Sequence, residues 1–168
     1  MSFTPESGDR LRNFMTEPTC HPLFEVRASP IHGRGVHALH WLPRGTCLGT
    51  YEGRRYDDAA LLDIDWGQRH DGMTYLFALS DGTTIDGAEG GNDLRFLNYA
   101  CRPNCEAVEW REEDGCLVLR LATVDTVAAG AELFLDYGLV IDESESALDY
   151  PCRCGLPGCR GTLVAATT

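Results

Sequence analysis

The chain has 168 residues, which is the size of one domain with a core of its own. Hydrophobic residues make up 43% of it and charged residues 24%, as is typical of a soluble globular protein. A net charge of −12 argues against binding to nucleic acid, whose phosphates require clustered lysine and arginine. The charge favours a basic partner such as a lysine-rich peptide, and acidity that only confers solubility explains it equally well.

Residues 1–22 are predicted to be a flexible or loosely packed lead-in, without the apolar stretch of a signal peptide. No run of the chain approaches the ~18 apolar residues of a membrane span, and no basic cluster indicates a nuclear address. We therefore expect a cytoplasmic, nucleoid or nuclear protein that is not secreted by a recognisable signal peptide. We also expect a monomer that binds neither a membrane nor nucleic acid directly.

Short apolar alternations separated by turns predict a mainly β fold with few helices. Expected strands cover residues 23–28, 46–51, 74–79, 83–85, 106–111, 115–122 and 133–135, and another begins at Val36. Residues 80–82 are expected to close a hairpin. The best helix candidate runs from Asp57, a capping residue, to Trp66, with Ala59, Leu62 and Trp66 on one face.

Two stretches place polar residues among apolar ones without a simple helical or strand period. Residues 95–105 read RFLNYACRPNC, and residues 132–138 read ELFLDYG. Because these stretches otherwise look buried, Asn98 and Asn104 need partners. Each asparagine is expected to act as a backbone clamp or as a ligand contact.

Eight cysteines in a chain without a secretion signal indicate metal binding or free thiols before disulfides. The C-x-C-x4-C spacing of Cys152, Cys154 and Cys159 supplies three of the four ligands of a tetrahedral zinc site. Three free or disulfide-prone thiols are the alternative. The remaining side chains of interest are interpreted as small buried hydrophobes (Cys20, Cys47, Cys105, Cys116) or as structural or exposed histidines (His37, His40, His70).

These motifs resemble those of SET-domain protein-lysine methyltransferases. Residues 95–105 resemble R-F-x-N-H-S-C-x-P-N-C, residues 132–138 resemble E-L-x-x-D-Y-G, and residues 152–161 resemble the zinc-binding post-SET tail. They occur in the family's order, and the resemblance covers roughly residues 23–164. It implies a SET-domain fold of small β-sheets, short helices and a pseudoknot-like crossing of the first two motifs.

The resemblance also implies a domain organisation. A SET domain would cover residues 23–138, and a post-SET zinc tail would cover residues 151–168. The acidic residues 139–150 between them are interpreted as a solvated, mobile linker. In the family the central motif supplies the fourth zinc ligand, and Cys101 matches that position. The four-thiolate site would hold a tail that has almost no core of its own.

The implied reaction is methyl transfer from S-adenosylmethionine to the side-chain amine of a lysine in a basic protein. The substrate classes left open are histones and DNA-packaging, ribosomal or host proteins. Tyr137 and Tyr75 match the family's catalytic tyrosines, although a buried tyrosine is also an ordinary core residue. An apolar channel and the adjacent sulfonium both favour a neutral amine, so hydroxyls and carbonyls suffice without a strong general base.

The implied cofactor-binding residues begin with the turn that holds the methionine part of the cofactor. In chain order they are His32, Gly33, Arg34, Gly35, Tyr75, Arg95, Asn98, Tyr99, Tyr137 and Leu156. Arg95 is expected to brace the motif or the cofactor end, and Leu156 to cover the adenine. Tyr99 stands where the family has histidine, and Arg54 stands where it has glutamate. These departures keep open a catalytically silent SET-like binding module, and a cysteine-dependent hydrolase is a third hypothesis.

Leu135 and Phe77 are implied to line the lysine channel. The family commonly has phenylalanine or tyrosine at the position of Leu135, which carries neither a ring nor a hydroxyl. We therefore expect methylation to proceed past the monomethyl state. Phe77 is the alternative side chain that fills the same space.

Overall fold

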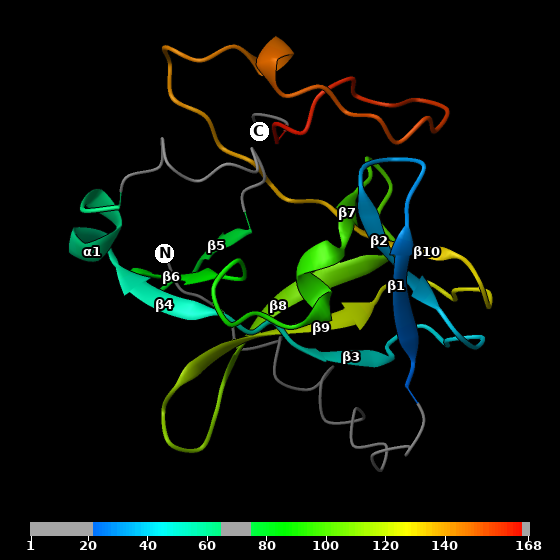
Figure 1. Cartoon of the computed structure of the whole chain (residues 1–168), viewed down its shortest axis with the longest axis horizontal. Coiled ribbons are helices and arrows are strands. Elements are labelled where there is room, and N and C mark those ends of the chain that lie inside the picture. Colours follow the sequence, from blue (N-terminus) through cyan, green and yellow to red (C-terminus); the bar gives the residue numbers. More distant parts are fainter. Residues whose placement is uncertain (1–21, 65–74, 166–168) are drawn as a thin grey trace, which may run out of the picture.

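The computed structural model describes residues 22–64 and 75–165, and these form three small sheets with little helix (Figure 1). The strand orders are β1-β2-β10-β7, β3-β9-β8 and β4-β6-β5. The strands are β1 (Phe24–Ala28), β2 (Arg34–Ala38), β3 (Cys47–Thr50), β4 (Arg54–Asp57), β5 (Leu76–Ala78), β6 (Thr83–Asp86), β7 (Asn98–Tyr99), β8 (Cys105–Arg111), β9 (Leu117–Thr123) and β10 (Glu132–Leu135). The predicted mainly β fold of small sheets is confirmed.

The first sheet brings the two motif stretches together. Strand β10 pairs antiparallel with β2 on one side and parallel with the short β7 on the other. In the parallel pair, Phe134 lies opposite Asn98 and Leu135 opposite Tyr99. These strands are more than 30 residues apart in sequence, so a parallel pairing requires the chain to cross over. The predicted crossing of the two motifs is thus present at β7 and β10.

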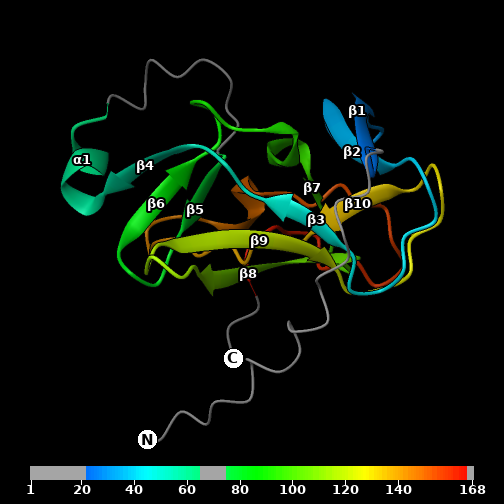
Figure 2. The same ribbon diagram turned by 90° about the horizontal axis from the view of Figure 1, so that it is seen from below.

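The hydrophobic core draws residues from all three sheets, and β9 and β10 contribute several of its most buried side chains. Leu117, Leu119 and Leu121 alternate along β9 with side chains that are almost fully buried. Leu133 and Leu135 of β10 join the same cluster. In the view of Figure 2, the long strands β8 and β9 run below β5 and β6 and extend towards β10. The core therefore supports β10, which carries the second motif.

Helix α1 (Asp58–Leu62) confirms the predicted start. Asp57 caps it, because the Asp57 carboxylate accepts a hydrogen bond of 2.8 Å from the Ala60 amide. On the expected apolar face, Ala59 is exposed and Leu62 is 87% exposed. The preceding strand β4 was not expected, because its sequence is mostly charged; it forms by pairing with β6.

The C-terminal segment, orange to red in Figure 1, runs along one side of the domain. Residues 139–150 were expected to be a mobile linker, but they pair with the tail. Leu139 forms a parallel bridge with Val164, and the Tyr150 carbonyl accepts a hydrogen bond from the Leu163 amide. A short 3-10 helix, η3 (Ala147–Asp149), is capped by Ser146. The segment is largely solvated as predicted, but hydrogen bonds hold it to the tail.

Some predictions lie outside the described residues: the lead-in up to residue 21, Cys20, Trp66, the loop 68–72 with His70, and Thr74. Within residues 22–64 and 75–165, no helix combines the length and apolar character that crossing a membrane requires.

Candidate active site and metal centre

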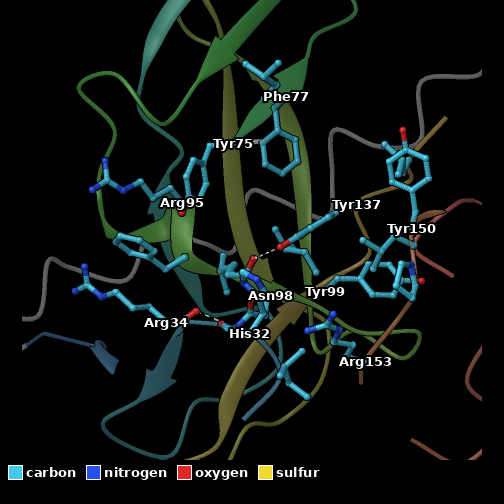
Figure 3. Close-up of a pocket in the computed structure, with 18 of the residues that line it drawn as sticks. His32, Arg34, Tyr75, Phe77, Arg95, Asn98, Tyr99, Tyr137, Tyr150 and Arg153 are labelled. Carbon is cyan, nitrogen blue, oxygen red and sulfur yellow. Dashed lines mark hydrogen bonds between the residues drawn. The ribbon is translucent and has the colours of Figure 1, made fainter. Parts of the chain in front are cut away.

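A cavity of about 670 Å³ lies where the crossing strands meet the C-terminal segment (Figure 3). Its volume is that of a small-molecule site, which typically measures about 300–1,000 Å³. Aromatic and aliphatic side chains dominate its walls. The lining residues are Ile31, His32, Arg34, Tyr51, Tyr75, Leu76, Phe77, Leu94, Arg95, Phe96, Leu97, Asn98, Tyr99, Leu135, Tyr137, Leu139, Val140, Ile141, Glu145, Asp149, Tyr150, Pro151, Arg153 and Leu163.

Asn98 clamps the turn at one end of the cavity. Its Nδ2 donates to the carbonyl oxygens of Arg34 at 2.9 Å and His32 at 3.3 Å, and to Glu132 Oε1 at 2.8 Å. Asn104 clamps β10 in a similar way: its Nδ2 donates to the Glu132 carbonyl at 2.9 Å, and its Oδ1 accepts from the Phe134 amide at 2.7 Å. Each asparagine was predicted to be a backbone clamp or a ligand contact, and the structure shows the clamp for both.

Glu132 is the buried carboxylate on which this turn rests. Besides Asn98, Ser29 Oγ donates to Glu132 Oε2 at 3.0 Å, and His37 Nε2 lies 3.7 Å from the same oxygen. Gly35 lies directly against it, because a Cβ at Gly35 would fall 2.1 Å from Glu132 Oε1. Only glycine fits there without displacing the carboxylate. His37 is buried and structural, as predicted.

Tyr137 carries its hydroxyl into the cavity, where the hydroxyl donates a 2.7 Å hydrogen bond to the Leu97 carbonyl (Figure 3). Burial of the hydroxyl, and next the neighbouring Tyr75, raise the pKa of Tyr137 above its usual value. It therefore stays protonated at any physiological pH. Its oxygen can still accept a hydrogen bond, because a hydroxyl has two acceptor lone pairs.

Tyr51 and Tyr75 form the wall next to Tyr137. The Tyr51 hydroxyl donates to the Tyr75 carbonyl at 2.9 Å, and burial is the main cause that raises the Tyr51 pKa. The Tyr51 and Phe77 rings meet edge to face with centroids 4.8 Å apart. This rigid aromatic wall brings Tyr75 and Phe77 to the cavity. Leu135 lines it too, although Leu135 is only 2% exposed and belongs to the core.

Two arginines flank Phe96 on the side of the cavity opposite Tyr150 and Arg153 (Figure 3). The guanidinium carbon of Arg34 lies 4.3 Å from the Phe96 ring centroid, and that of Arg95 lies 4.7 Å from it. Arg95 Nη1 also donates to the Gly87 carbonyl at 3.1 Å. Arg95 thus braces the motif, which was one of the two roles predicted for it.

Four cysteines gather at the base of the C-terminal tail: Cys101, Cys152, Cys154 and Cys159. All four sulfurs lie within 4.8 Å of one another, and Cys101 Sγ lies 3.6 Å from both Cys152 Sγ and Cys159 Sγ. Zn–S bonds of about 2.3 Å in a tetrahedron place the sulfurs about 3.8 Å apart, so the set fits zinc. A disulfide needs about 2.05 Å, so these thiols are not paired.

Backbone amides donate hydrogen bonds to the sulfurs of the cysteine cluster. Arg160 N donates to Cys101 Sγ at 3.2 Å, Gly161 N to Cys159 Sγ at 3.3 Å, and Cys154 N to Cys152 Sγ at 3.4 Å. Of the other cysteines in the described residues, Cys105 is buried as predicted. The same prediction was wrong for Cys116, which is exposed because it follows the turn of the β8–β9 hairpin.

The structure brings most of the predicted catalytic, cofactor-binding and channel residues to one cavity. Among them, Gly33, Gly35 and Leu156 are the exceptions, since they do not line it. The lining residues that the sequence analysis missed include Tyr51, Leu139, Val140, Tyr150 and Arg153. Tyr51 lies three residues before Arg54, Tyr150 lies two residues before Cys152, and Arg153 lies between Cys152 and Cys154. These places close to motif residues are the signal that could have found the three, whereas Leu139 and Val140 lie in no motif.

Comparisons with known proteins identify the class. The family model described as "SET domain" matches residues 33–138. The chain is 31% identical over 137 residues, or 80% of its length, to a "Histone-lysine N-methyltransferase, H3 lysine-4 specific" of Yarrowia lipolytica, of which the match covers 12%. It is 34% identical over 139 residues to a protein of the same description from Mycosarcoma maydis, covering 80% of this chain and 9% of that protein. It is 28% identical over 159 residues to the human "Histone-lysine N-methyltransferase, H3 lysine-36 specific", covering 94% of this chain and 6% of that protein.

The chain belongs to the SET-domain family, because the family model matches most of its length. Its match spans at most about an eighth of the length of these curated relatives. The cysteine cluster combines Cys101 of the matched domain with three cysteines that follow it, and it fits the zinc site of a post-SET tail.

Proposed function

We propose that this chain is a protein-lysine N-methyltransferase that uses S-adenosylmethionine and is held together by one structural zinc ion. The observation that carries the proposal is the Tyr137 hydroxyl, which faces the cavity and is fixed by the Leu97 carbonyl. Membership of the SET family and the names of the relatives support it. Residues 23–138 are the proposed SET domain, 139–150 the linker and 151–168 the zinc tail.

Bound S-adenosylmethionine supplies an electrophilic methyl group on a positively charged sulfonium. We assign its binding to the turn of His32, Gly33, Arg34 and Gly35, together with Tyr75, Arg95, Asn98, Tyr99, Tyr137 and Leu156. The Asn98 clamp supports this assignment, because it fixes two carbonyls of the turn before any ligand arrives. Arg34 and Arg95 give the same end of the cavity a positive charge suited to a carboxylate.

Tyr137 and Tyr75 orient the lysine amine. The Tyr137 hydroxyl donates a hydrogen bond to the Leu97 carbonyl, so the lone pairs on the hydroxyl oxygen are available to accept a hydrogen bond from an N–H of the amine. Phe77 and Leu135 provide an apolar channel in which an ammonium is disfavoured, so the amine enters neutral with a free lone pair. The lysine proton leaves to solvent before transfer, and alignment of the reacting atoms supplies most of the rate enhancement.

The proposed substrate is a lysine in a basic protein segment, with a histone or another DNA-packaging protein as the first choice. The relatives' printed names support histones, and the net charge of −12 supports a basic partner. Glu145 and Asp149 place acidic groups on the cavity lining itself. A histone substrate would make the nucleus the site of action.

The proposal is tested by incubating the purified chain with labelled S-adenosylmethionine and separate pools of histones, ribosomal proteins and total basic proteins. The label should enter a lysine side chain, most strongly in histones, as mass spectrometry of the product would show. A silent SET-like binding module predicts no label in any pool. Calorimetry separates this module from a wrong choice of substrate, because an enzyme binds the demethylated cofactor product and the silent module releases no heat with it.

A further inference from the structure

Arg160, the residue after the last tail cysteine, bridges two parts of the molecule with its side chain. Its Nη2 donates to Asp136 Oδ2 at 2.6 Å and also to the Tyr99 hydroxyl. Asp136 immediately precedes Tyr137, and Tyr99 lies on β7 opposite Leu135 of β10. One guanidinium therefore joins the C-terminal tail to both strands that cross beneath the cavity.

The backbone of the same residue reaches the cysteine cluster, because Arg160 N donates to Cys101 Sγ at 3.2 Å. Tyr99 makes a parallel connection: its hydroxyl lies 3.6 Å from Cys101 Sγ and donates to the Thr162 carbonyl at 3.3 Å. Tyr99 stands where the family motif has histidine. The tyrosine hydroxyl at this position is the group that meets Arg160 and the tail.

Tyr137 lies between these two connections. On one side, Asp136 Oδ1 accepts a hydrogen bond of 3.1 Å from the Gly138 amide, so Arg160 and the turn around Tyr137 hold the same carboxylate. On the other side, the Tyr99 ring meets the Tyr137 ring edge to face, with centroids 5.6 Å apart (Figure 3). A shift of Arg160 would thus reach Tyr137 through both neighbours.

We propose that Arg160 is a positioning residue that sets Tyr137 through Asp136 and Tyr99, and so couples the zinc tail to the active site. Its role is geometric, because an ion pair whose side chains are 29% and 34% exposed adds little to stability. The inference deepens the proposed function, since its kinetic consequence rests on Tyr137 being catalytic. Its structural consequence does not depend on activity.

The test compares three variants of the full, zinc-loaded chain: Arg160→Met, Arg160→Lys and Arg102→Met. Arg102 is the matched control, because it is an exposed arginine next to Cys101 that lies outside the cavity lining. Hydrogen exchange should rise at least about fivefold in the segment around residues 136–138 of Arg160→Met and stay unchanged in Arg102→Met. Zinc content should remain at one ion per chain in all three.

The second measurement is steady-state kinetics with the protein pool that the native chain methylates. Arg160→Met should lower kcat about tenfold or more and change the KM for the basic substrate by less than about threefold, because misplacing Tyr137 affects the transition state more than peptide binding. Arg160→Lys should recover part of kcat, since an ammonium can pair with Asp136 but lacks the planar fork that also reaches Tyr99.

Loss of zinc from Arg160→Met would overturn the inference, because Arg160 would then serve the metal site alone. The inference would also be overturned if hydrogen exchange and kcat of Arg160→Met equalled those of Arg102→Met. If the native chain methylates nothing while exchange still rises in Arg160→Met, the positioning role stands and the proposed function fails.

Discussion

Replacing Gly35 with alanine tests the packing beneath the cofactor turn. The new Cβ would lie 2.1 Å from Glu132 Oε1, 2.8 Å from Glu132 Cδ and 3.0 Å from Ser29 Cβ. Gly35 is not among the glycines with a positive φ, so backbone strain adds nothing to this clash. The carboxylate must move, and it is buried where Asn98 and Ser29 donate to it.

The size of the effect follows from these contacts. Overpacking a core costs about 1–3 kcal/mol, and losing a hydrogen bond to a charged group costs about 1.5–3 kcal/mol. Since the two losses share one carboxylate, we expect Gly35→Ala to lower the free energy of unfolding by about 3 kcal/mol. The affinity for S-adenosylmethionine should fall too, because Asn98 holds both Glu132 and the turn carbonyls.

Urea unfolding of a double-mutant cycle measures this directly. Removing the carboxylate with Glu132→Ala opens the space, so Gly35→Ala should cost less than about 1 kcal/mol in that background. The two single variants should therefore be strongly non-additive, with no change in the slope of unfolding against urea. Additive costs, or a neutral Gly35→Ala in the native background, would refute the packing argument.

Four further predictions follow from the site. Zinc chelation or Cys154→Ser should release the tail and weaken cofactor binding, as proteolysis and calorimetry would show; reduced, freshly purified protein without zinc would contradict this. Methyl transfer to a basic protein should fall as salt rises from about 0.05 to about 0.5 M, and a flat profile would exclude charge from recognition. The native enzyme should proceed past monomethyl-lysine in a mass-spectrometric time course, and Leu135→Tyr should shift product towards the monomethyl form; monomethyl product alone from the native chain would refute this. Folding stability should fall as pH rises above about 9 to 10, because the folded-state pKa values of Cys105, Tyr51 and Tyr137 are raised above those of the unfolded chain; a melting temperature that does not change beyond that pH would be the contrary result.

Motif residues whose chemistry is local were predicted well from the sequence. The side chains of Asn98 and Asn104 need hydrogen-bond partners when they are buried, and backbone groups of the neighbouring segments provide these partners. The position of Cys101 in the family motif predicted a place beside the three tail cysteines, where it lies. These predictions succeeded because they depended on residue type and order, not on exact packing.

The features that the sequence analysis missed belong to segments whose structure comes from distant partners. Strand β4 is mostly charged and forms because β6 pairs with it. Residues 139–150 have the composition of a linker, yet their backbone pairs with residues 163 and 164. The bridge from Arg160 to Asp136 and Tyr99 likewise joins residues that are 24 and 61 positions apart. No local pattern encodes such contacts.

The central claim is that Tyr137 positions a lysine for methylation within this cavity. The most direct measurement compares single-turnover methyl transfer by the native chain and by Tyr137→Phe. Mass spectrometry first identifies the substrate lysine that receives the methyl group. Phenylalanine keeps the ring that packs on Tyr99 and removes only the hydroxyl, which is hydrogen-bonded to the Leu97 carbonyl. A folded variant that still binds the demethylated cofactor should lose activity by about 10²-fold or more, the usual effect of removing one preorganised polar group. Near-native turnover by that variant would contradict the assignment of Tyr137.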